Sequence, residues 1–257
     1  MSDDLIVERD GSLLRVTFNR PAQRNAMTWQ MYEELAQACE RADRDDGIRA
    51  MLLRGAGDAA FVAGTDIAQF RAFTDGDEGV AYEARLSGLV GRLESVRVPT
   101  VAAVSGYCVG AGLAIAAVCD IRVATSDARF GIPIARTLGN CLSMRTYALL
   151  VYHLGPARTL DMILRARLFS AEEARAAGFV AETCAPGELD ELANAVVHRL
   201  SEHAPLTMWA TKEAVRRLRL ANLPDGDDLV RTVFGSEDFH RGVEAFLAKR
   251  PAEWTGR

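Results

Sequence analysis

The chain has 257 residues, of which 49% are hydrophobic and 25% charged, a composition typical of a soluble globular protein with one large domain or one domain and a small appendage. Its net charge of −5 and the absence of a basic, aromatic-interleaved patch argue against nucleic-acid binding. The five cysteines form no CxxC pair and the four histidines are far apart, which argues against zinc and for reduced thiols in the cytoplasm. The N-terminus lacks the apolar core of a signal peptide, and glycines interrupt the apolar run 101–119, so we expect no membrane span.

The first half of the chain alternates strand and helix signals. Apolar runs at 6–7 and 13–18 flank Asp10–Gly11 and predict a hairpin. After a polar loop, Thr28 is a suitable N-cap for a helix with an apolar stripe. A buried strand over 48–53 follows, then a glycine-rich loop over 55–66, a helix or lid at 67–75, and a helix over 78–95.

Residues 101–120 are the most informative segment. A β-branched apolar run, a glycine cluster and a second apolar run predict a buried strand, a turn and a buried helix that ends at Asp120. Gly110, Ala111 and Gly112 place backbone N–H groups at the start of that helix, where donors are unpaired and the dipole is positive. Such a site can hold an oxyanion, although a tight turn alone would show the same glycines. We expect Asp120 to be structural, with its carboxylate capping nearby backbone.

The second half begins with strands and becomes helical. Short strands are expected at 121–124 and 128–130, a loop over 131–140, and a helix at about 142–153. Ser170 and Glu173 form a capping box for a helix that ends at Gly178, and 186–200 is helical. From Pro205 onward the sequence pattern predicts only helices. The order predicts an α/β fold with a core over 1–201 and a helical region over 202–257.

Several stretches, in order, resemble the crotonase (enoyl-CoA hydratase/isomerase) superfamily. They are NRPAQRNAM (19–27), FVAGTDI (61–67), AAVSGYCVGAG (102–112), CDIRVATSDARFGIP (119–133), SAEEARAAGFV (170–180) and SEDFHRGVEAFLAKRPAEW (236–254). The resemblance implies a spiral of ββα turns, a C-terminal helical region that builds a homotrimer or hexamer, and a role in fatty acid metabolism. It also implies an acyl-CoA substrate, with coenzyme A entering as part of the thioester and no permanently bound cofactor.

The resemblance also assigns residues. The backbone N–H groups of Thr65 and Ala111 would form the oxyanion hole for a thioester enolate. The coenzyme A contacts would come from Arg24, Ala26, Ala63, Asp66, Ile67, Phe246 and Lys249. For Asp66 the alternative is N-capping of the helix after it. For Arg24 and Lys249 the alternative to binding phosphate is an ordinary solvated charge.

The two glutamates of family hydratases are missing. Their positions correspond to Ala114 and Ile134, neither of which can transfer a proton. Replacement chemistry could come from Arg136, as a carboxylate or enolate partner or as a structural ion pair, and from Asn140 together with Ser143. Cys141 is a possible nucleophile, but a buried structural thiol is the better interpretation because no histidine lies near it in the sequence.

These residues predict an acyl-CoA enzyme that stabilises an enolate and has weak or no ordinary hydratase activity. Decarboxylation of a malonyl-type thioester fits because loss of CO₂ produces the enolate without a base. A double-bond shift would need one proton carrier, which the sequence does not identify. The alternative from another class is a non-catalytic scaffold that binds CoA thioesters.

Overall fold

The computed structural model describes residues 3–257, and two sheets form its centre. The larger sheet has the strand order β1 (Leu5–Asp10), β2 (Leu13–Phe18), β3 (Ala50–Gly55), β5 (Thr100–Val104), β7 (Ile121–Thr125) and β10 (Glu182–Cys184). Only the β1–β2 hairpin in this sheet is antiparallel. The smaller sheet has the order β4 (Ala60–Val62), β6 (Tyr107–Val109), β8 (Arg129–Gly131) and β9 (Phe169–Ser170).

Successive strand pairs are divided between the two sheets. β3, β5 and β7 lie side by side in the larger sheet, and β4, β6 and β8, which directly follow them in the chain, lie side by side in the smaller one. A helix follows each pair: α2 (Gly76–Glu94), α3 (Ala111–Val118) and α4 (Ile134–Thr137). This repetition confirms the predicted α/β spiral of ββα turns.

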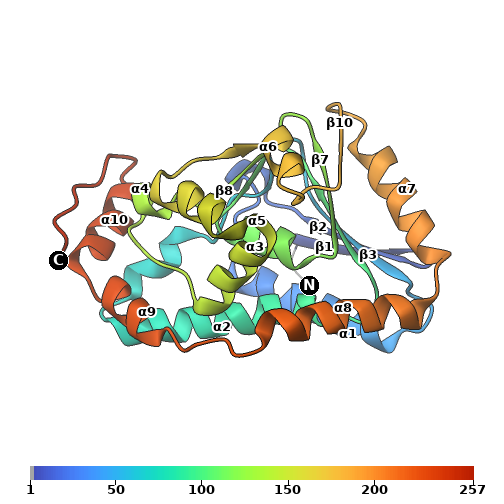
Figure 1. Cartoon of the computed structure of the whole chain (residues 1–257). Helices are drawn as coiled ribbons and strands as arrows, with labels where there is room; N and C mark the ends of the chain where they lie inside the picture. Colours follow the sequence, from blue (N-terminus) through green and yellow to red (C-terminus); the bar gives the residue numbers. More distant parts are fainter. Residues whose placement is uncertain (1–2) are drawn as a thin grey trace.

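The remaining helices surround the sheets (Figure 1). They are α1 (Trp29–Arg44), α5 (Met144–Leu164), α6 (Ala171–Ala176), α7 (Leu189–Ser201), α8 (Pro205–Leu220), α9 (Asp227–Phe234) and α10 (Glu237–Leu247), with short 3₁₀ turns η1 (Pro21–Gln23) and η2 (Ile67–Ala72). The C-terminal helices return over the core, with α9 against α2 and α10 against η2. Among the described residues, no helix combines the length and apolar character needed to cross a membrane.

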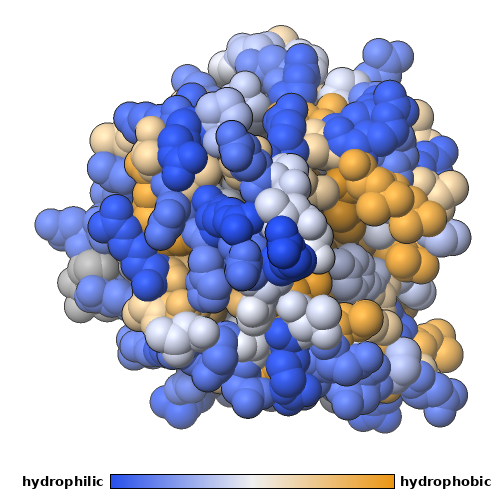
Figure 2. Space-filling view, turned by 90° about the vertical axis from the view of Figure 1, so that its left-hand side faces the viewer, coloured by the Kyte–Doolittle hydropathy of each residue, from blue (hydrophilic) through white to orange (hydrophobic). Residues whose placement is uncertain are grey.

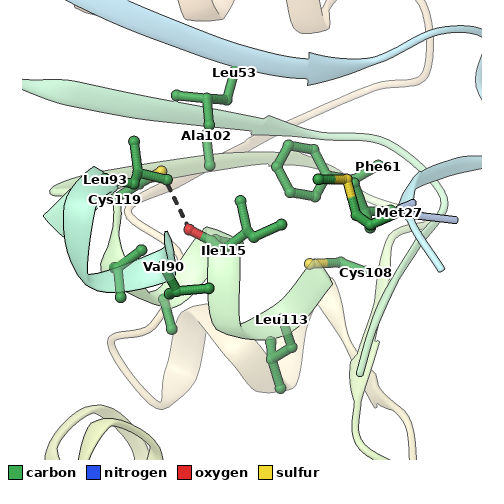
Figure 3. Packing of buried hydrophobic residues seen from close by; sticks show 14 of the residues in the cluster. Met27, Leu53, Phe61, Val90, Leu93, Ala102, Cys108, Leu113, Ile115 and Cys119 are labelled. Carbon is green, nitrogen blue, oxygen red and sulfur yellow. Dashed lines mark hydrogen bonds between the residues drawn. The ribbon is translucent and has the colours of Figure 1, made fainter. Parts of the chain in front are cut away.

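Side-chain alternation gives the larger sheet a hydrophobic layer on each face. Met51 and Leu53 of β3 face the main core, whereas Ala50 and Leu52 face a smaller core under α7, as a two-residue period requires. In the main core, Ile115 of α3 points toward Ala102 of β5, and Leu113 lies on the opposite side of the helix (Figure 3). Most of α3 is therefore held by packing in the core, which fixes the position of its first turn.

The long elements agree with the sequence analysis, and so does the short strand β8, but most of the other short elements do not. Thr28, Ser170 and Asp75 cap α1, α6 and α2 through their side chains, the first two as predicted. The strands β4, β6, β9 and β10 were not expected, because two or three residues are too few to show alternation. Residues 134–137 are helical rather than loop, and α5 continues to Leu164 through a kink at Gly155, which precedes Pro156.

Asp120 has the structural role that we expected. Its carboxylate accepts hydrogen bonds from the backbone N–H and the hydroxyl of Thr100, at 2.7 Å and 2.8 Å, at the start of β5. It also pairs with Lys212 of α8, whose ammonium donates to the backbone carbonyl of Val98. One carboxylate thus connects the end of α3, the start of β5 and the C-terminal helices.

Candidate active site

Two glycine turns meet at the N-terminal start of α3. Gly64, between β4 and η2, has φ +101°, and Gly110, between β6 and α3, has φ +57°, so both lie in the region that favours glycine. A Cβ built on Gly110 would lie 3.4 Å from the Cα of Gly64, and one on Gly112 would lie 2.0 Å from the carbonyl oxygen of Val62. The turns are therefore in direct contact, which brings together Thr65 and Ala111, the residues that follow them.

The local hydrogen bonds indicate which backbone N–H groups of these turns are left without a backbone partner in the adjoining strand or helix. Met27 pairs with the residues on either side of Thr65, donating to Gly64 O at 2.9 Å and accepting from Asp66 N at 2.9 Å. In a parallel bridge of this kind the central residue directs its own N–H away from the partner strand. Ala111 is the first residue of α3, where helical N–H groups have no partner within the helix.

The Thr65 side chain is buried and fixed by two phenols. Its hydroxyl lies 2.9 Å from the hydroxyl of Tyr32 and 3.1 Å from that of Tyr82. Burial raises the pKa of both tyrosines above the ordinary value of 10, so both remain protonated at neutral pH. This hydroxyl cluster holds the turn in place rather than supplying a proton carrier.

A cavity of about 460 Å³ opens beside the two turns. Thr65 and Ala111 line it, and most of its wall is apolar, as in the binding sites of hydrophobic acyl groups. Its apolar lining includes Leu86, Val90, Ala114, Val118, Ile132, Ile134, Leu142 and Leu149. Ala114 and Ile134, the positions expected to lack a glutamate, thus contribute only hydrocarbon to the wall.

Glu83 of α2 supplies a carboxyl group that the sequence analysis did not identify. The residue lines the cavity, is 4% exposed, and accepts a 2.8 Å hydrogen bond from the backbone N–H of Ser143. Burial raises its pKa from 4.5 to about 7, against the lowering effect of the Ser143 bonds. Its charge also raises the pKa of Tyr32 and Tyr82, after the larger effect of burial. A carboxyl group of this kind can accept and release a proton at neutral pH.

Most residues assigned to coenzyme A lie together on the cavity wall, namely Arg24, Ala26, Ala63, Asp66, Ile67 and Phe246; Lys249 is not part of that wall. The Arg24 guanidinium lies 5.4 Å from the ring centre of Tyr107, over its face. Asp66 caps η2 by accepting from Ala68 N at 3.2 Å and pairs with Arg20 at 3.4 Å. The capping interpretation of Asp66 therefore holds, together with its place on the wall.

Of the four candidate residues in the segment after Ile134, only Asn140 lines the cavity. Asn140 lines the cavity and its buried side-chain oxygen has no hydrogen-bond partner among the described residues, so it can accept a bond from a ligand. Arg136 is exposed and is not part of the cavity wall. Ser143 caps α5. The Cys141 thiol is buried, which raises its pKa to about 12, as expected for a structural thiol.

Arginines line the cavity at the far end of α2. Arg145 of α5 and Arg219 of α8 both belong to the wall, and both pair with the carboxylate of Glu94 at the end of α2. The side chains of Arg219 and Glu94 are 4% and 9% exposed. The sequence analysis did not identify this part of the site, because α8 reaches the cavity only through its last turn.

Helical spacing could have identified Glu83. It lies three residues before Leu86 and seven before Val90, so it is on the apolar face of α2 although it is charged. A charged residue on a buried stripe is an informative exception. No comparable signal marks Arg219, which follows a run of alternating charges on a solvated helix.

Comparison with known proteins shows the family to which the chain belongs. A probable enoyl-CoA hydratase of Mycobacterium bovis is 33% identical over 99% of both chains. The crystal structure of an enoyl-CoA hydratase/carnithine racemase from Magnetospirillum magneticum has a TM-score of 0.81 and 30% identity over 100% of this chain and 97% of that one. A methylmalonyl-CoA decarboxylase in complex with 2-nitronate-propionyl-CoA has a TM-score of 0.91 and 25% identity over the whole of both chains. The family model for enoyl-CoA hydratase/isomerase matches residues 8–257, and the chain belongs to that family.

Proposed function

We propose that the protein is an acyl-CoA enzyme that stabilises a thioester enolate with the N–H groups of Thr65 and Ala111 and moves a proton with Glu83. The observation that carries the proposal is the cavity itself. A single buried carboxyl group with a pKa of about 7 lies in the apolar wall that also contains the two glycine turns. Family membership supports a CoA thioester as the substrate.

The proposed step is a proton transfer at the α-carbon. The Glu83 carboxylate takes the α-proton, the C–H electron pair moves into the thioester, and the negative oxygen accepts hydrogen bonds from Thr65 and Ala111. Donors already aimed at the developing charge need little reorganisation. The protonated Glu83 then returns the proton to the same carbon, which gives exchange, or to the γ-carbon of an unsaturated chain, which gives a double-bond shift. Glu83 is thus the proton carrier that a double-bond shift requires.

Ordinary hydration fits this cavity less well. Adding water to a double bond needs a group that activates the water as well as one that delivers the proton, and Ala114 and Ile134 supply neither. One carboxyl group remains where two would act, and a positioned proton-transfer group contributes about 10²- to 10⁴-fold to rate. We expect crotonyl-CoA hydration to be slow for that reason.

Decarboxylation of a malonyl-type thioester is the second candidate. The TM-score of 0.91 over the full length of a methylmalonyl-CoA decarboxylase favours it. Breaking the bond to the carboxylate leaves its electron pair in the enolate, so no base is required, and Glu83 in its protonated form can supply the proton that the α-carbon takes up.

The test is deuterium incorporation at the α-carbon of butyryl-CoA in D₂O, followed by mass spectrometry. We expect wild-type protein to catalyse exchange and Glu83→Gln to lose it by about 10²-fold or more while its affinity for butyryl-CoA, measured by calorimetry, is kept. The exchange rate should rise with pH and level off above about 7, as the carboxylate forms. The matched control is Glu78→Gln, a change of the same chemistry on the same helix, where glutamine can keep the capping box.

Each outcome is decisive. Exchange that survives in Glu83→Gln would remove Glu83 from the mechanism. Binding of butyryl-CoA and of methylmalonyl-CoA with neither exchange nor release of CO₂ would instead establish the scaffold alternative. Release of CO₂ without exchange in the saturated thioester would select decarboxylation over the double-bond shift.

A further inference from the structure

The far end of the cavity contains a buried cation with unused hydrogen-bonding capacity. Arg219 donates to Glu94 through Nη2, whereas its buried Nη1 has no hydrogen-bond partner among the described residues. Buried guanidinium N–H groups without an acceptor are unfavourable, and proteins almost always provide one. Because Arg219 is part of the cavity wall, a ligand in the cavity can supply that acceptor.

The charges at this end do not balance. Arg145 and Arg219 share the single carboxylate of Glu94, Arg145 at 2.9 Å, which leaves an excess of one positive charge. Arg216, the next cation on α8, is paired with Glu213 at 2.8 Å. The nearby His153 is neutral at pH 7, because burial and the charge of Arg122 lower its pKa to about 4. The unmatched charge therefore favours an anion.

α2 shows how far this anion would lie from the thioester. Tyr82, Glu83, Leu86, Ser87 and Val90 line the cavity along one face of the helix, and Glu94 is the next residue on that face. Tyr82 is bonded to Thr65 at one end, and Glu94 to Arg219 at the other. These positions are twelve residues apart, which is about 18 Å along a helix.

The wall between the two ends suits a methylene chain. It includes Leu86, Val90, Val118 and Leu149. The Arg145 guanidinium occupies space left by Gly91, since a Cβ on that glycine would lie 2.9 Å from Nη2 of Arg145. The cavity thus offers donors for a thioester oxygen, then an apolar stretch, then a cationic end.

We propose that Arg219, assisted by Arg145, binds a carboxylate at the far end of the acyl chain, so that the substrate is the CoA monothioester of a dicarboxylic acid. The proposal rests on the proposed function, because it assumes that the thioester lies at Thr65 and Ala111. It concerns a carboxylate several bonds away from the reacting carbon, not the α-carboxylate that a decarboxylase removes.

The first experiment needs no variant. Calorimetric affinity and α-proton exchange are measured for succinyl-, adipyl-, suberyl- and sebacyl-CoA, each beside the monocarboxylic acyl-CoA with the same number of carbons. We expect one or two of the longer dicarboxylic thioesters to bind about 10- to 100-fold more tightly than their uncharged partners, the range for a charged hydrogen bond in a buried site. Equal affinity within every pair would overturn the proposal.

Variants then locate the carboxylate. Arg219→Met keeps length and packing without charge, and should make suberyl-CoA and octanoyl-CoA bind with equal affinity, because the carboxylate no longer has a cationic partner. Arg219→Lys should keep part of the preference. Arg216→Met is the matched control, because it removes a cation from the same helix outside the cavity wall. A dicarboxylic preference that persists in Arg219→Met would contradict the assignment to Arg219.

The two proposals fail in different ways. If octanoyl-CoA and suberyl-CoA bind equally and both exchange their α-protons, the proposed function stands and the carboxylate site is wrong. If suberyl-CoA binds more tightly through Arg219 but nothing exchanges, the site stands and the enolate chemistry fails. Thermal unfolding of Arg219→Met, compared with Arg219→Met/Glu94→Gln, checks whether Glu94 destabilises the fold when it keeps Arg145 but has lost Arg219.

Discussion

Glu83 illustrates how a single residue can gain function at the expense of stability. Its carboxyl group is buried in an apolar wall with one strong donor, the backbone N–H of Ser143. Solvation lost on burial favours the neutral acid, which is the cause of the raised pKa. The same desolvation that prepares the group to move a proton at neutral pH makes its ionised form costly in the folded state.

A dependence of stability on pH follows. Between the ordinary pKa of 4.5 and about 7, the folded protein holds a proton on Glu83 that the unfolded chain has released. Glu83 therefore stabilises the folded protein at low pH. As the pH rises from about 4.5 to about 7, this contribution to the free energy of unfolding is lost and amounts to about 3 kcal/mol. In Glu83→Gln this contribution should be absent. Denaturant unfolding of both proteins at about pH 4 and about pH 8 measures the difference; parallel curves would contradict the raised pKa.

At this scale the sequence predicted which backbone turns meet at the cavity better than which side chains line it. Thr65 and Ala111 are marked by glycines with unusual local geometry, which leave a readable pattern. Arg219 is brought to the cavity, and to Glu94 of α2, by the packing of α8 beside α5, which no local pattern encodes. The expectation that Arg136 lines the site came from its nearness in the chain, whereas the short helix α4 places it on the surface.

Among the elements, α8 is joined to the core by polar contacts rather than by its own buried residues. No residue of α8 is buried as a whole, but two of its cationic side chains are. Arg219, 4% exposed, reaches Glu94, and Lys212, 11% exposed, reaches Asp120 and the carbonyl oxygen of Val98. The Lys212–Asp120 ion pair joins the C-terminal helices to the start of β5. Loss of one partner leaves the other charge without compensation in a partly buried place.

Lys212→Met should therefore destabilise the protein by about 1.5–3 kcal/mol, the range for a lost hydrogen bond to a charged group. Arg217→Met on the same helix, where the arginine pairs with Glu213 and is largely exposed, should cost less than about 1 kcal/mol. Chemical denaturation at neutral pH compares the two. Equal effects would mean that the Asp120 pair contributes no more than a surface pair.

The predictability of elements followed their length and their caps. α1, α2 and α6 are long or carry a side-chain cap that the sequence shows directly. β4 and β6, with three residues each, are strands because neighbouring turns of the spiral align them, with β6 between β4 and β8. Their pairing is a tertiary effect, so a local pattern could not reveal them.

For the whole molecule, apolar side chains at the surface indicate assembly. α8 exposes Leu206, Trp209, Val215 and Leu218, and α5 exposes Val151, Tyr152, Leu160 and Leu164. Viewed from the end that carries α10, the surface also shows hydrophobic side chains gathered on one side of a mainly hydrophilic face (Figure 2). Surfaces of this kind are typical of subunit interfaces.

The trimer or hexamer that the resemblance implied, and the separate region over 202–257, remain predictions. We expect light scattering after size exclusion to give the mass of three or six chains, and Leu206→Asp/Leu218→Asp to give a smaller species with unchanged helical circular dichroism. Gln30→Asp, on α1, is the control. A wild-type protein that runs as a single chain at micromolar concentration would contradict the prediction.

In the proposed site the hydrogen-bond donors belong to the main chain, and the acids, bases and cations are side chains. This has a consequence for how the enzyme can evolve. The donors proposed at positions 65 and 111 belong to the peptide backbone, so a substitution there alters shape without deleting the hydrogen bond. The acids, bases and cations around them stand on α2, α5 and α8, where single codons can replace them. If the proposed donors are right, support for an enolate is inherited with the fold, while the choice of reaction and of acyl group is open to mutation one residue at a time.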